Sequence, residues 1–513
     1  QQLELRQLLT QVAGDILQDT VWTEADSPYE VISGVTVPAG VVLEIEPGVV
    51  VKFSPGTGLD VRGRLLAEGT VDSRIRFERA DNGQPWEGMS FRSTLADNRI
   101  AYADMVGGDG QGEAINVHHA RLQLDHIVWA DTTTTILELE HPSLIVRNSH
   151  FPPSGGGEVV HGEFISGDEY LILESNVFAN SNNGGDVLDF LGAARPGPVL
   201  QLLNNIFLGG GDDGLDLDGT DAHIEGNVFM NFRKNTSRGT TSNAIATGLP
   251  QNGDPNRTEI TVVRNIFINN DYALLLKEDA FAVVEQNVFV DSQIAALQFD
   301  ERNGTAVQGP GQGAELWGNI FADNTQLFSN LVDLPSFTTQ LTVNQSLLPN
   351  ESVDFGGTPI NAHELGFGNV AGEPLFVDPL AHDFRLQADS PAKGVGPQGL
   401  DMGAYVPAGP KVTRREDNTT VGNATFDVGG PGITHYRFRL PDHAWSPLTS
   451  VDIPIELTGL DLGSHQLEVV GMNSAGEWAT GEGASWQDRT VRLLTPSAAR
   501  KGESLPIVAH ALD

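Results

Sequence analysis

The densest group of ionisable side chains in this sequence is an acidic, glycine-rich turn. It reads Gly209-Gly-Gly-Asp212-Asp213-Gly-Leu-Asp216-Leu-Asp218-Gly-Thr-Asp221. Carboxylates this close repel one another unless water solvates them or a cation is shared among them. Calcium suits such a turn because it takes about six to eight oxygen ligands in flexible geometry. We therefore expect either a calcium site or a solvated acidic turn, with these ligands: Asp186, Asp212, Asp213 and Asp216, and Asp189 close by.

A repeated phrase around this turn indicates how its residues are positioned. An Asn, an apolar residue and a Phe recur at Asn176-Val-Phe178, Asn205-Ile-Phe207, Asn227-Val-Phe229, Asn265-Ile-Phe267, Asn287-Val-Phe289 and Asn319-Ile-Phe321. The shortest interval is 22 residues and the others contain insertions, a pattern typical of a solenoid whose coils stack while their loops vary. We predict that the Asn residues form a hydrogen-bonded ladder and the Phe residues an internal aromatic column.

Apolar alternation within the coils predicts which side chains point outward. In Gly214-Leu-Asp-Leu-Asp218 the two Leu residues must face the core, so the two Asp residues face solvent. The same reasoning on successive coils gives an outward column of mostly acidic residues: His118, Glu138, Glu140, Asp189, Asp216, Asp218, Lys277 and Asp300. We expect function on this face and in the inserted loops, and interpret His118, His119, His161 and His223 as structural.

The stretch Thr36-Val-Pro-Ala-Gly-Val-Val-Leu-Glu-Ile-Glu-Pro-Gly-Val-Val-Val-Lys-Phe53, with Gly63-Arg-Leu-Leu-Ala-Glu-Gly69 and Trp86-Glu-Gly88, resembles the first coils of secreted bacterial right-handed parallel β-helix proteins. Asp389-Ser-Pro-Ala-Lys-Gly394 and Leu400-Asp-Met-Gly-Ala404 resemble their closing segment. The resemblance implies an all-β fold: a right-handed parallel β-helix over 30–406, followed by a small antiparallel β-sandwich.

The flanking segments are expected to be separate. Helical spacing over 3–17 predicts an amphipathic helix within a cap or linker at 1–29. Residues 411–494 resemble an Ig-like or fibronectin-type sandwich, and 495–513 the start of a further module or a linker. We expect a monomeric piece of a larger multidomain chain.

The segment Asp212-Asp213-Gly-Leu-Asp216-Leu217 resembles the Asp-Asp-Gly-Trp-Asp-Leu segment of calcium-dependent pectate lyases of this fold, with Leu215 in place of Trp. The resemblance implies calcium at these acids and a Lys that removes the proton beside a uronate carboxylate. Lys277 is the candidate base; its alternative is a salt bridge to Glu278 or Asp218. The candidate substrate-binding cations are Arg233, Lys234 and Arg302.

Glycoside hydrolysis is the alternative chemistry, because it needs two carboxylates, one of them protonated. Asp189, Asp216, Asp218, Asp300 and Glu301 offer such pairs, and crowding among them would raise one pKa. The Gly-His-Gly and Arg-Ile-Lys phrases of β-helix polygalacturonases do not occur in the sequence. Both reactions therefore stay open.

The composition of the chain limits the classes of molecule that it can bind. The chain has 513 residues, 68 acidic and 30 basic, and a formal charge of −38. This charge repels nucleic acid and anionic membranes, and also acidic polysaccharides unless a cation bridges them. There is no Cys, and no apolar run long enough to span a membrane. We expect a secreted bacterial protein, free or attached to the cell surface, that cleaves an acidic polysaccharide, with a marine polysaccharide as one option. The alternative is a non-catalytic glycan-binding, adhesin or stalk module.

Overall fold

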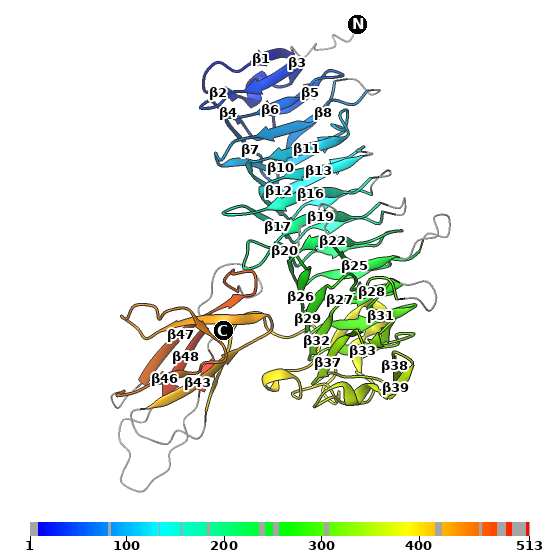
Figure 1. Ribbon diagram of the computed structural model, residues 1–513. Helices are drawn as coiled ribbons and strands as arrows, with labels where there is room; N and C mark the ends of the chain where they lie inside the picture. The colour runs from blue at the N-terminus through cyan, green and yellow to red at the C-terminus, as the bar shows by residue number, and fades with distance from the viewer. Residues whose placement is uncertain are drawn as a thin grey trace.

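The computed structural model describes residues 9–80, 84–132, 134–153, 155, 157–181, 185–234, 242–249, 256–301, 307–415, 423–460, 464–479, 489–494 and 509–511. Its main part is a parallel β-solenoid whose coils stack from β1 near one end to β38 and β39 at the other (Figure 1). In agreement with the sequence prediction, the protein is all-β apart from short 3-10 turns. Among the described residues, no helix is long and apolar enough to cross a membrane.

Each coil contributes strands to three faces. The face that the outward acids occupy, here called the groove sheet, consists of β6 (Leu59–Val61), β9 (Met89–Arg92), β11 (Glu113–His118), β13 (Thr135–Glu140), β16 (Val160–Ile165), β19 (Leu188–Ala193), β22 (Leu215–Thr220), β25 (Asn243–Gly248), β28 (Tyr272–Leu275), β31 (Ala295–Gln298) and β34 (Phe328–Ser329). Each strand from β6 to β31 pairs in parallel with the strand after it in this order.

The second face consists of β2 (Thr20–Trp22), β4 (Val42–Ile45), β7 (Arg64–Glu68), β14 (Ser143–Arg147), β17 (Tyr170–Glu174), β20 (Leu200–Leu203), β23 (Ala222–Glu225), β26 (Glu259–Val263), β29 (Phe281–Glu285), β32 (Gly313–Trp317) and β37 (Gln340–Asn344). The third consists of β5 (Val50–Phe53), β8 (Ile75–Arg79), β15 (His150–Phe151), β18 (Val177–Phe178), β21 (Ile206–Phe207), β24 (Val228–Met230), β27 (Ile266–Ile268), β30 (Val288–Val290) and β33 (Ile320–Ala322). The longer strands β1 (Thr10–Asp15), β3 (Tyr29–Val37), β10 (Asn98–Val106) and β12 (Arg121–Ala130) bend across two faces.

The predicted Asn ladder and Phe column are confirmed. The Oδ1 atom of each Asn accepts hydrogen bonds from the backbone N–H and the Nδ2 of the Asn in the preceding coil, for example Asn205 from Asn176 at 2.9 and 3.0 Å. The Phe rings stack with centroids 4.6 to 5.2 Å apart between Phe178 and Phe321. These contacts satisfy buried amides at each corner and fix the register of the coils.

The ladder has serine at both ends, which the repeat phrase did not indicate. Ser149 donates its backbone N–H to Asn176 Oδ1 at 3.0 Å, and Ser346 Oγ accepts from the N–H of Asn319 at 3.1 Å. Phe151 and Trp129 extend the aromatic column toward the N-terminus.

The helix predicted over 3–17 is wrong for the described part of that segment. Thr10–Asp15 forms β1, which pairs in parallel with β3; residues 1–8 lie outside the described residues. The β-branched Thr10 and Val12 favour an extended strand, and the pairing supplies hydrogen bonds to the first coil. The N-terminal end of the solenoid is therefore capped by strand β1 and not by a helix. A 3-10 turn, Glu24–Asp26, follows β2.

Beyond the solenoid strands the chain forms small antiparallel sheets. Hairpins pair β35 (Asp333–Leu334) with β36 (Phe337–Thr338), β38 (Ser352–Phe355) with β39 (Thr358–Asn361), and β40 (Phe376–Asp378) with β41 (Asp383–Leu386). The 3-10 turns Ala362–Leu365, Pro379–Ala381 and Pro397–Gly399 lie among or after them.

Two antiparallel sheets near the C-terminus share one hydrophobic core. The first contains β42 (Lys411–Arg414), β43 (Ala424–Gly429) and β46 (Ile455–Leu457); the second contains β44 (Ile433–Arg439), β45 (Thr449–Ser450), β47 (Ser464–Asn473), β48 (Arg489–Leu494) and β49 (Ala509–Ala511). The Ig-like identity and the domain boundaries stay predictions.

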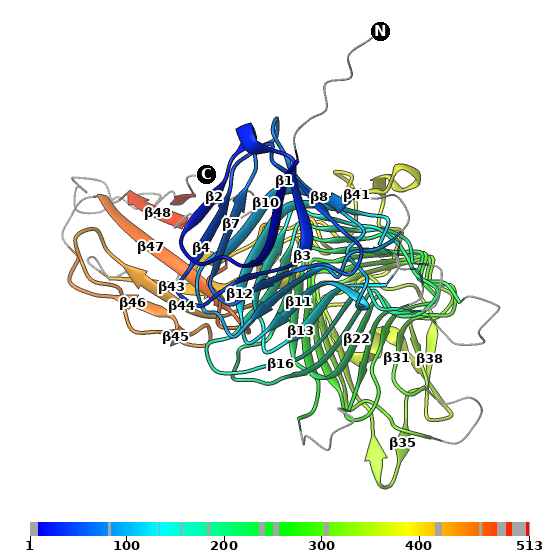
Figure 2. The same ribbon diagram turned by 90° about the horizontal axis from the view of Figure 1, so that it is seen from above.

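The C-terminal sheets lie beside the second face (Figure 2). Thr261 Oγ1 and Ser474 Oγ are 2.9 Å apart, and the N–H of Gly432 donates to Glu285 Oε2 at 2.8 Å. Thr261 and Glu285 belong to β26 and β29, so these contacts lie on the second face and not on the groove sheet.

Candidate functional site

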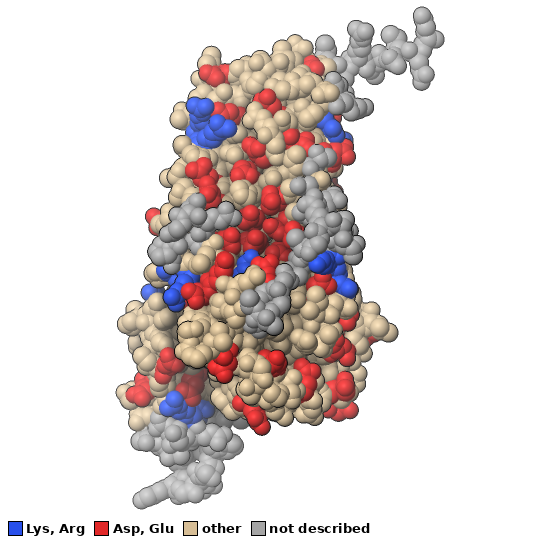
Figure 3. Space-filling model, turned by 45° about the vertical axis from the view of Figure 1, so that its right-hand side comes forward, with Lys and Arg blue, Asp and Glu red and all other residues tan. Residues whose placement is uncertain are grey.

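Acidic side chains gather on the groove sheet in a continuous patch (Figure 3). The strand register aligns one outward column as Asn116, Glu138, His161, Asp189 and Asp216. A second column, two residues further along each strand, contains His118, Glu140, Glu163, Leu191 and Asp218. The predicted outward positions of Asp189, Asp216 and Asp218 are thus confirmed.

Asp189, Asp216 and Asp218 form the centre of this patch. Asp189 is the direct register partner of Asp216, and Asp218 lies two residues further along β22 on the same face. Burial, with the charge of Asp216 next, raises the pKa of Asp189 to about 6 and that of Asp218 to about 7. The Asp216 carboxyl also has a raised pKa because of burial, and its Oδ1 is buried without a hydrogen bond from any described residue.

His161 supplies a positive charge beside this group. Its Nδ1 is 2.8 Å from Glu138 Oε1, and that hydrogen bond raises the pKa of His161 to about 9 despite partial burial. The imidazolium lies next to Asp189 in the register and lowers the pKa of that carboxyl. The sequence interpretation of His161 as structural therefore missed an electrostatic role, whereas His223 is fully buried and bound to Glu225 at 3.0 Å.

The coil that follows carries small residues at the outward positions. Ala246 and Gly248 pair with Asp216 and Asp218. A Cβ atom at position 248 would overlap Asp218 Oδ1 and stand 3.4 Å from Glu278 Oε2. Gly248 thus makes room for two carboxylates, and Glu278 joins the site although the sequence pattern did not single it out.

A third set of acids lies where the groove strands begin. Oxygen atoms of Asp186, Asp212 and Asp213 all lie within 4.8 Å of one another. The Oδ1 of Asp186 accepts from the N–H of Asp213 at 3.0 Å, and the Oδ1 of Asp213 accepts from the N–H and Nδ2 of Asn243 at 2.9 and 2.7 Å.

Burial, and then the charges of neighbouring acids, raise the pKa values of Asp186 and Asp213. Burial and then the charges of Asp213, Asp216 and Asp212 raise the pKa of Asp186 to about 9. Burial and then the charge of Asp216 raise the pKa of Asp213 well above its usual range. Hard carboxylate oxygens at this spacing fit a calcium ion, which would relieve the repulsion. Asp186, Asp212 and Asp213 are the residues that would hold it, and Asp216 lies nearby.

Lys277 lies two coils beyond Asp216 and has an ion-pair partner. Its Nζ is 3.2 Å from Glu301 Oε2. Burial lowers the pKa of Lys277, but the charges of Glu301 and Asp216 outweigh it and raise the pKa overall. Lys277 is therefore an ammonium group, which corresponds to the salt-bridge alternative, although with Glu301 as its partner.

Asp300 does not face the groove, contrary to the expectation from alternation. The residue is fully buried, and its Oδ1 accepts from the backbone N–H of Gly309 at 3.1 Å, with Gln308 N–H at 3.3 Å. Strand β31 ends at Gln298, so alternation no longer governs position 300. Its carboxylate fixes the loop at 307–309.

Of the cations proposed for substrate binding, Arg233 is held by side chains of the next coil. Arg233 bonds Asp271 Oδ1 at 2.9 Å and Asn269 Oδ1 at 2.7 Å, which secures the chain between β24 and β25. The backbone N–H of Lys234 donates to Asp271 Oδ2 at 2.6 Å, and the Lys234 side chain is exposed. Arg302 lies outside the described residues.

Fold and site together define a parallel β-solenoid with an acidic groove. No family model matches the chain. Over 113 residues the chain is 41% identical to Protein bark beetle of Drosophila melanogaster, an alignment that covers 22% of this chain and 3% of that protein. The chain thus spans a small part of that relative's length.

Among solved structures, the chain is similar to an alginate lyase from Paenibacillus sp., with 16% identity, 59% of this chain and 98% of that chain covered, and a TM-score of 0.32. The catalytic domain of an α-1,3-glucanase gives 11% identity, coverage of 61% and 68%, and a TM-score of 0.32. A tailspike of the E. coli bacteriophage HK620 gives 10% identity, coverage of 94% and 86%, and a TM-score of 0.27. These values describe a likeness of fold and not of function.

Proposed function

We propose that the protein hydrolyses a polysaccharide bound along the groove sheet, with Asp218 as the general acid and Asp189 as the general base. The observation that carries this proposal is their diagonal placement on neighbouring coils. Adjacent strands lie roughly 4.8 Å apart and alternate residues of one strand roughly 6.6 Å apart, so the two Cα positions are separated by roughly 8 Å. Because both side chains leave the same face of the sheet, their carboxyl groups have a separation of the same order. Inverting glycosidases place their two carboxyl groups about 6.5–9.5 Å apart to admit a water molecule.

The electrostatics support this division of roles. With a pKa of about 7, about half of the Asp218 carboxyls are protonated at neutral pH, and the protonated form can donate a proton to the leaving glycosidic oxygen. With a pKa of about 6 and the His161 imidazolium beside it, Asp189 is largely ionised and can accept a proton from the attacking water. Water then adds to the anomeric carbon as the bond to the leaving oxygen breaks.

Asp216 is less suited to either role because one of its carboxylate oxygens is buried. Its charge instead raises the pKa values of Asp189 and Asp218. Asp216 is therefore a positioning residue that acts through the pKa values of Asp189 and Asp218.

Calcium-assisted elimination from an acidic polysaccharide is a second candidate. The cluster of Asp186, Asp212 and Asp213 favours it, together with the resemblance of this segment to calcium-dependent pectate lyases. A hard cation there would supply charge neutralisation for a substrate carboxylate. The raised pKa of Lys277 disfavours it, because an ammonium group cannot accept the proton that elimination removes.

The test is a panel of neutral, uronic and sulfated polysaccharides assayed for new reducing ends and for the ultraviolet absorbance of unsaturated uronates. Wild type, Asp218→Asn, Asp189→Asn and the control Asp168→Asn, an exposed turn residue, are compared. Hydrolysis predicts reducing ends without new absorbance, lost in both groove variants and kept in the control. New absorbance would replace hydrolysis with elimination. Binding without cleavage of any polysaccharide would overturn the enzymatic proposal in favour of a glycan-binding module.

A further inference from the structure

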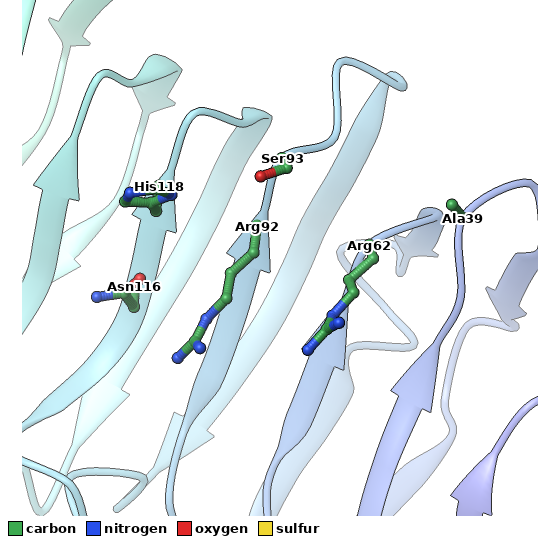
Figure 4. Close-up of a pocket in the computed structure, with 6 residues that line it drawn as sticks. All are labelled: Ala39, Arg62, Arg92, Ser93, Asn116 and His118. Atoms are coloured by element: carbon green, nitrogen blue, oxygen red, sulfur yellow. The ribbon is translucent and has the colours of Figure 1, made fainter.

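The groove sheet contains a pocket several coils away from Asp189, Asp216 and Asp218. It has a volume of about 630 Å³ and is lined by Ala39, Arg62, Arg92, Ser93, Asn116 and His118. Figure 4 shows the Arg62 and Arg92 side chains extending in the same direction from neighbouring strands, with Asn116 and His118 on the strand beside them. The polar lining is therefore basic and amide, in contrast to the carboxylates further along.

The pocket and the acidic patch share one outward column. His118 is the register partner of Arg92. Val61 is the register partner of Phe91, so Arg62 and Arg92 follow at equivalent positions on neighbouring coils. Toward the C-terminus the column continues through Glu140, Glu163 and Leu191 to Asp218. Five coil spacings of roughly 4.8 Å place Arg92 roughly 24 Å from Asp218 along the sheet. One ligand lying along the solenoid axis could contact both.

The charges in the pocket are incompletely compensated. Arg62 bonds the Oδ2 of Asp60 through its Nε and Nη2, both at 2.9 Å. Arg92 is exposed, donates to Ser90 Oγ at 3.3 Å and makes no salt bridge with a described residue. Glu113 lies within range of its charge: burial and the charge of Glu138 raise the pKa of the Glu113 carboxyl, and Arg92 lowers it. The Nε2 atom of His118 is 3.1 Å from Glu140 Oε2, so this ring nitrogen already has a partner. The guanidinium of Arg92 is therefore available to an incoming anion.

We propose that this pocket binds an acidic group of the polysaccharide, a carboxylate or a sulfate ester. Arg92 makes the principal contact, and Arg62, Asn116 and His118 lie around it. Guanidinium groups bind such planar or multi-oxygen anions through paired charge-assisted hydrogen bonds. This inference rests on the proposed function for the identity of the ligand, and it explains how a chain with a net charge of −38 accepts an anionic glycan at one end of its groove.

The experiment measures binding of fluorescent oligosaccharides of equal length that are neutral, uronic or sulfated. Wild type is compared with Arg92→Ala, Arg92→Lys and Arg62→Ala. Arg121→Ala is the control, because Arg121 is an exposed residue of β12, where that strand belongs to the second face. Loss of a hydrogen bond to a charged group predicts at least about tenfold weaker binding of an acidic oligosaccharide by Arg92→Ala. The neutral oligosaccharide and the control should be unaffected, and added salt should reduce the difference.

The uronic and sulfated arms identify which acidic group is bound. Unchanged affinity of Arg92→Ala and Arg62→Ala for both acidic oligosaccharides would overturn the proposal, provided that their melting temperatures match the wild type. The same ligands are measured with Asp218→Asn. If binding depends on Arg92 but the protein cleaves no glycan, the pocket proposal stands and the hydrolysis proposal is refuted. If acidic glycans are cleaved and Arg92→Ala changes neither their binding nor their cleavage, the pocket proposal is refuted and the hydrolysis proposal stands.

Discussion

Asp218 lies directly over Gly248 of the next coil, so closely that a side chain at position 248 would overlap its carboxylate. Glu278 Oε2 approaches the same point and also accepts a hydrogen bond from the N–H of Leu249 at 2.9 Å. The absence of a side chain at Gly248 therefore fixes where the proposed general acid stands.

Gly248→Ala should displace the Asp218 carboxylate. Its new methyl group would stand 3.0 Å from Asp218 Cγ and closer still to Oδ1, so the side chain must rotate away. We expect hydrolysis to fall at least about tenfold, since misplacement of a proton donor by about 1 Å is costly. The measurement is the initial rate of reducing-end release at saturating polysaccharide.

The matched control for this substitution is Gly34→Ala, because nothing lies within 4 Å of a Cβ atom at position 34. Equal rates in both variants would show that the position of Asp218 does not matter for activity.

The rate of hydrolysis should have a bell-shaped pH profile, with its maximum between the pKa values of Asp189 and Asp218. Asp189 must be ionised, so activity should fall below pH 6, and Asp218 must be protonated, so activity should fall above pH 7. Asp216→Asn removes a charge that raises both pKa values, and it should move both limbs to lower pH. A profile that stays in place, or moves to higher pH, would contradict the tuning role of Asp216.

Calcium should stabilise the fold more at high pH than at low pH. Because the folded-state pKa of Asp186 is raised to about 9, the stability linked to its proton is fully present below its unfolded pKa of about 3.9 and is lost as pH rises toward 9. A cation can replace the lost proton and adds stability by binding the folded state. Melting temperatures at pH 5 and pH 8, with calcium and with chelator, measure the effect.

Asp186→Asn removes the titrating group and one ligand, and it should weaken both the pH dependence and the calcium response. The matched control is again Asp168→Asn, since Asp168 is exposed. Identical melting curves with calcium and chelator at pH 8 would remove the cation from the account.

Asn227→Ala should destabilise the solenoid strongly. The Asn227 side chain accepts from the N–H and Nδ2 of Asn205 and donates to the carbonyl oxygen of Leu202 and to Asn265 Oδ1. Leaving these buried groups unpaired should cost about 2–4 kcal/mol of unfolding free energy. Denaturant unfolding measures the loss.

The control for the ladder is Asn350→Ala at an exposed position, where we expect little change. A loss at Asn227 no larger than that at Asn350 would mean that the ladder does not stabilise the coils.

The solenoid and its ladder could be predicted because one corner repeats with the same residue types in every central coil. The N-terminal coils lack the Asn and Phe phrase, so the sequence offered no register that aligned Arg62 with Arg92 and His118. Helical spacing near the N-terminus was misleading because strand pairing with β3 decides the structure of β1.

The outward orientation of the groove acids could be predicted from the sequence for residues within strands, but not for residues after a strand ends. Alternation placed Asp189, Asp216 and Asp218 on the outer face, but it failed at Asp300, which follows the end of β31. Glu278 reaches Asp218 from a backbone with φ of 55°, a conformation that no alternation pattern indicates. The partnership of His161 with Glu138 depends on which coils are adjacent, so it required the register.

The configuration of the first reducing end released from the polysaccharide tests the central claim most directly. Proton magnetic resonance recorded during the first turnovers distinguishes the two anomers before they equilibrate. The diagonal pair of Asp189 and Asp218 predicts an inverted anomeric centre, and Asp218→Asn should abolish the signal. A retained configuration would point to a closer pair such as Asp189 and Asp216, roughly 4.8 Å apart across the register. That result, an unsaturated product or the absence of any cleavage would contradict the account.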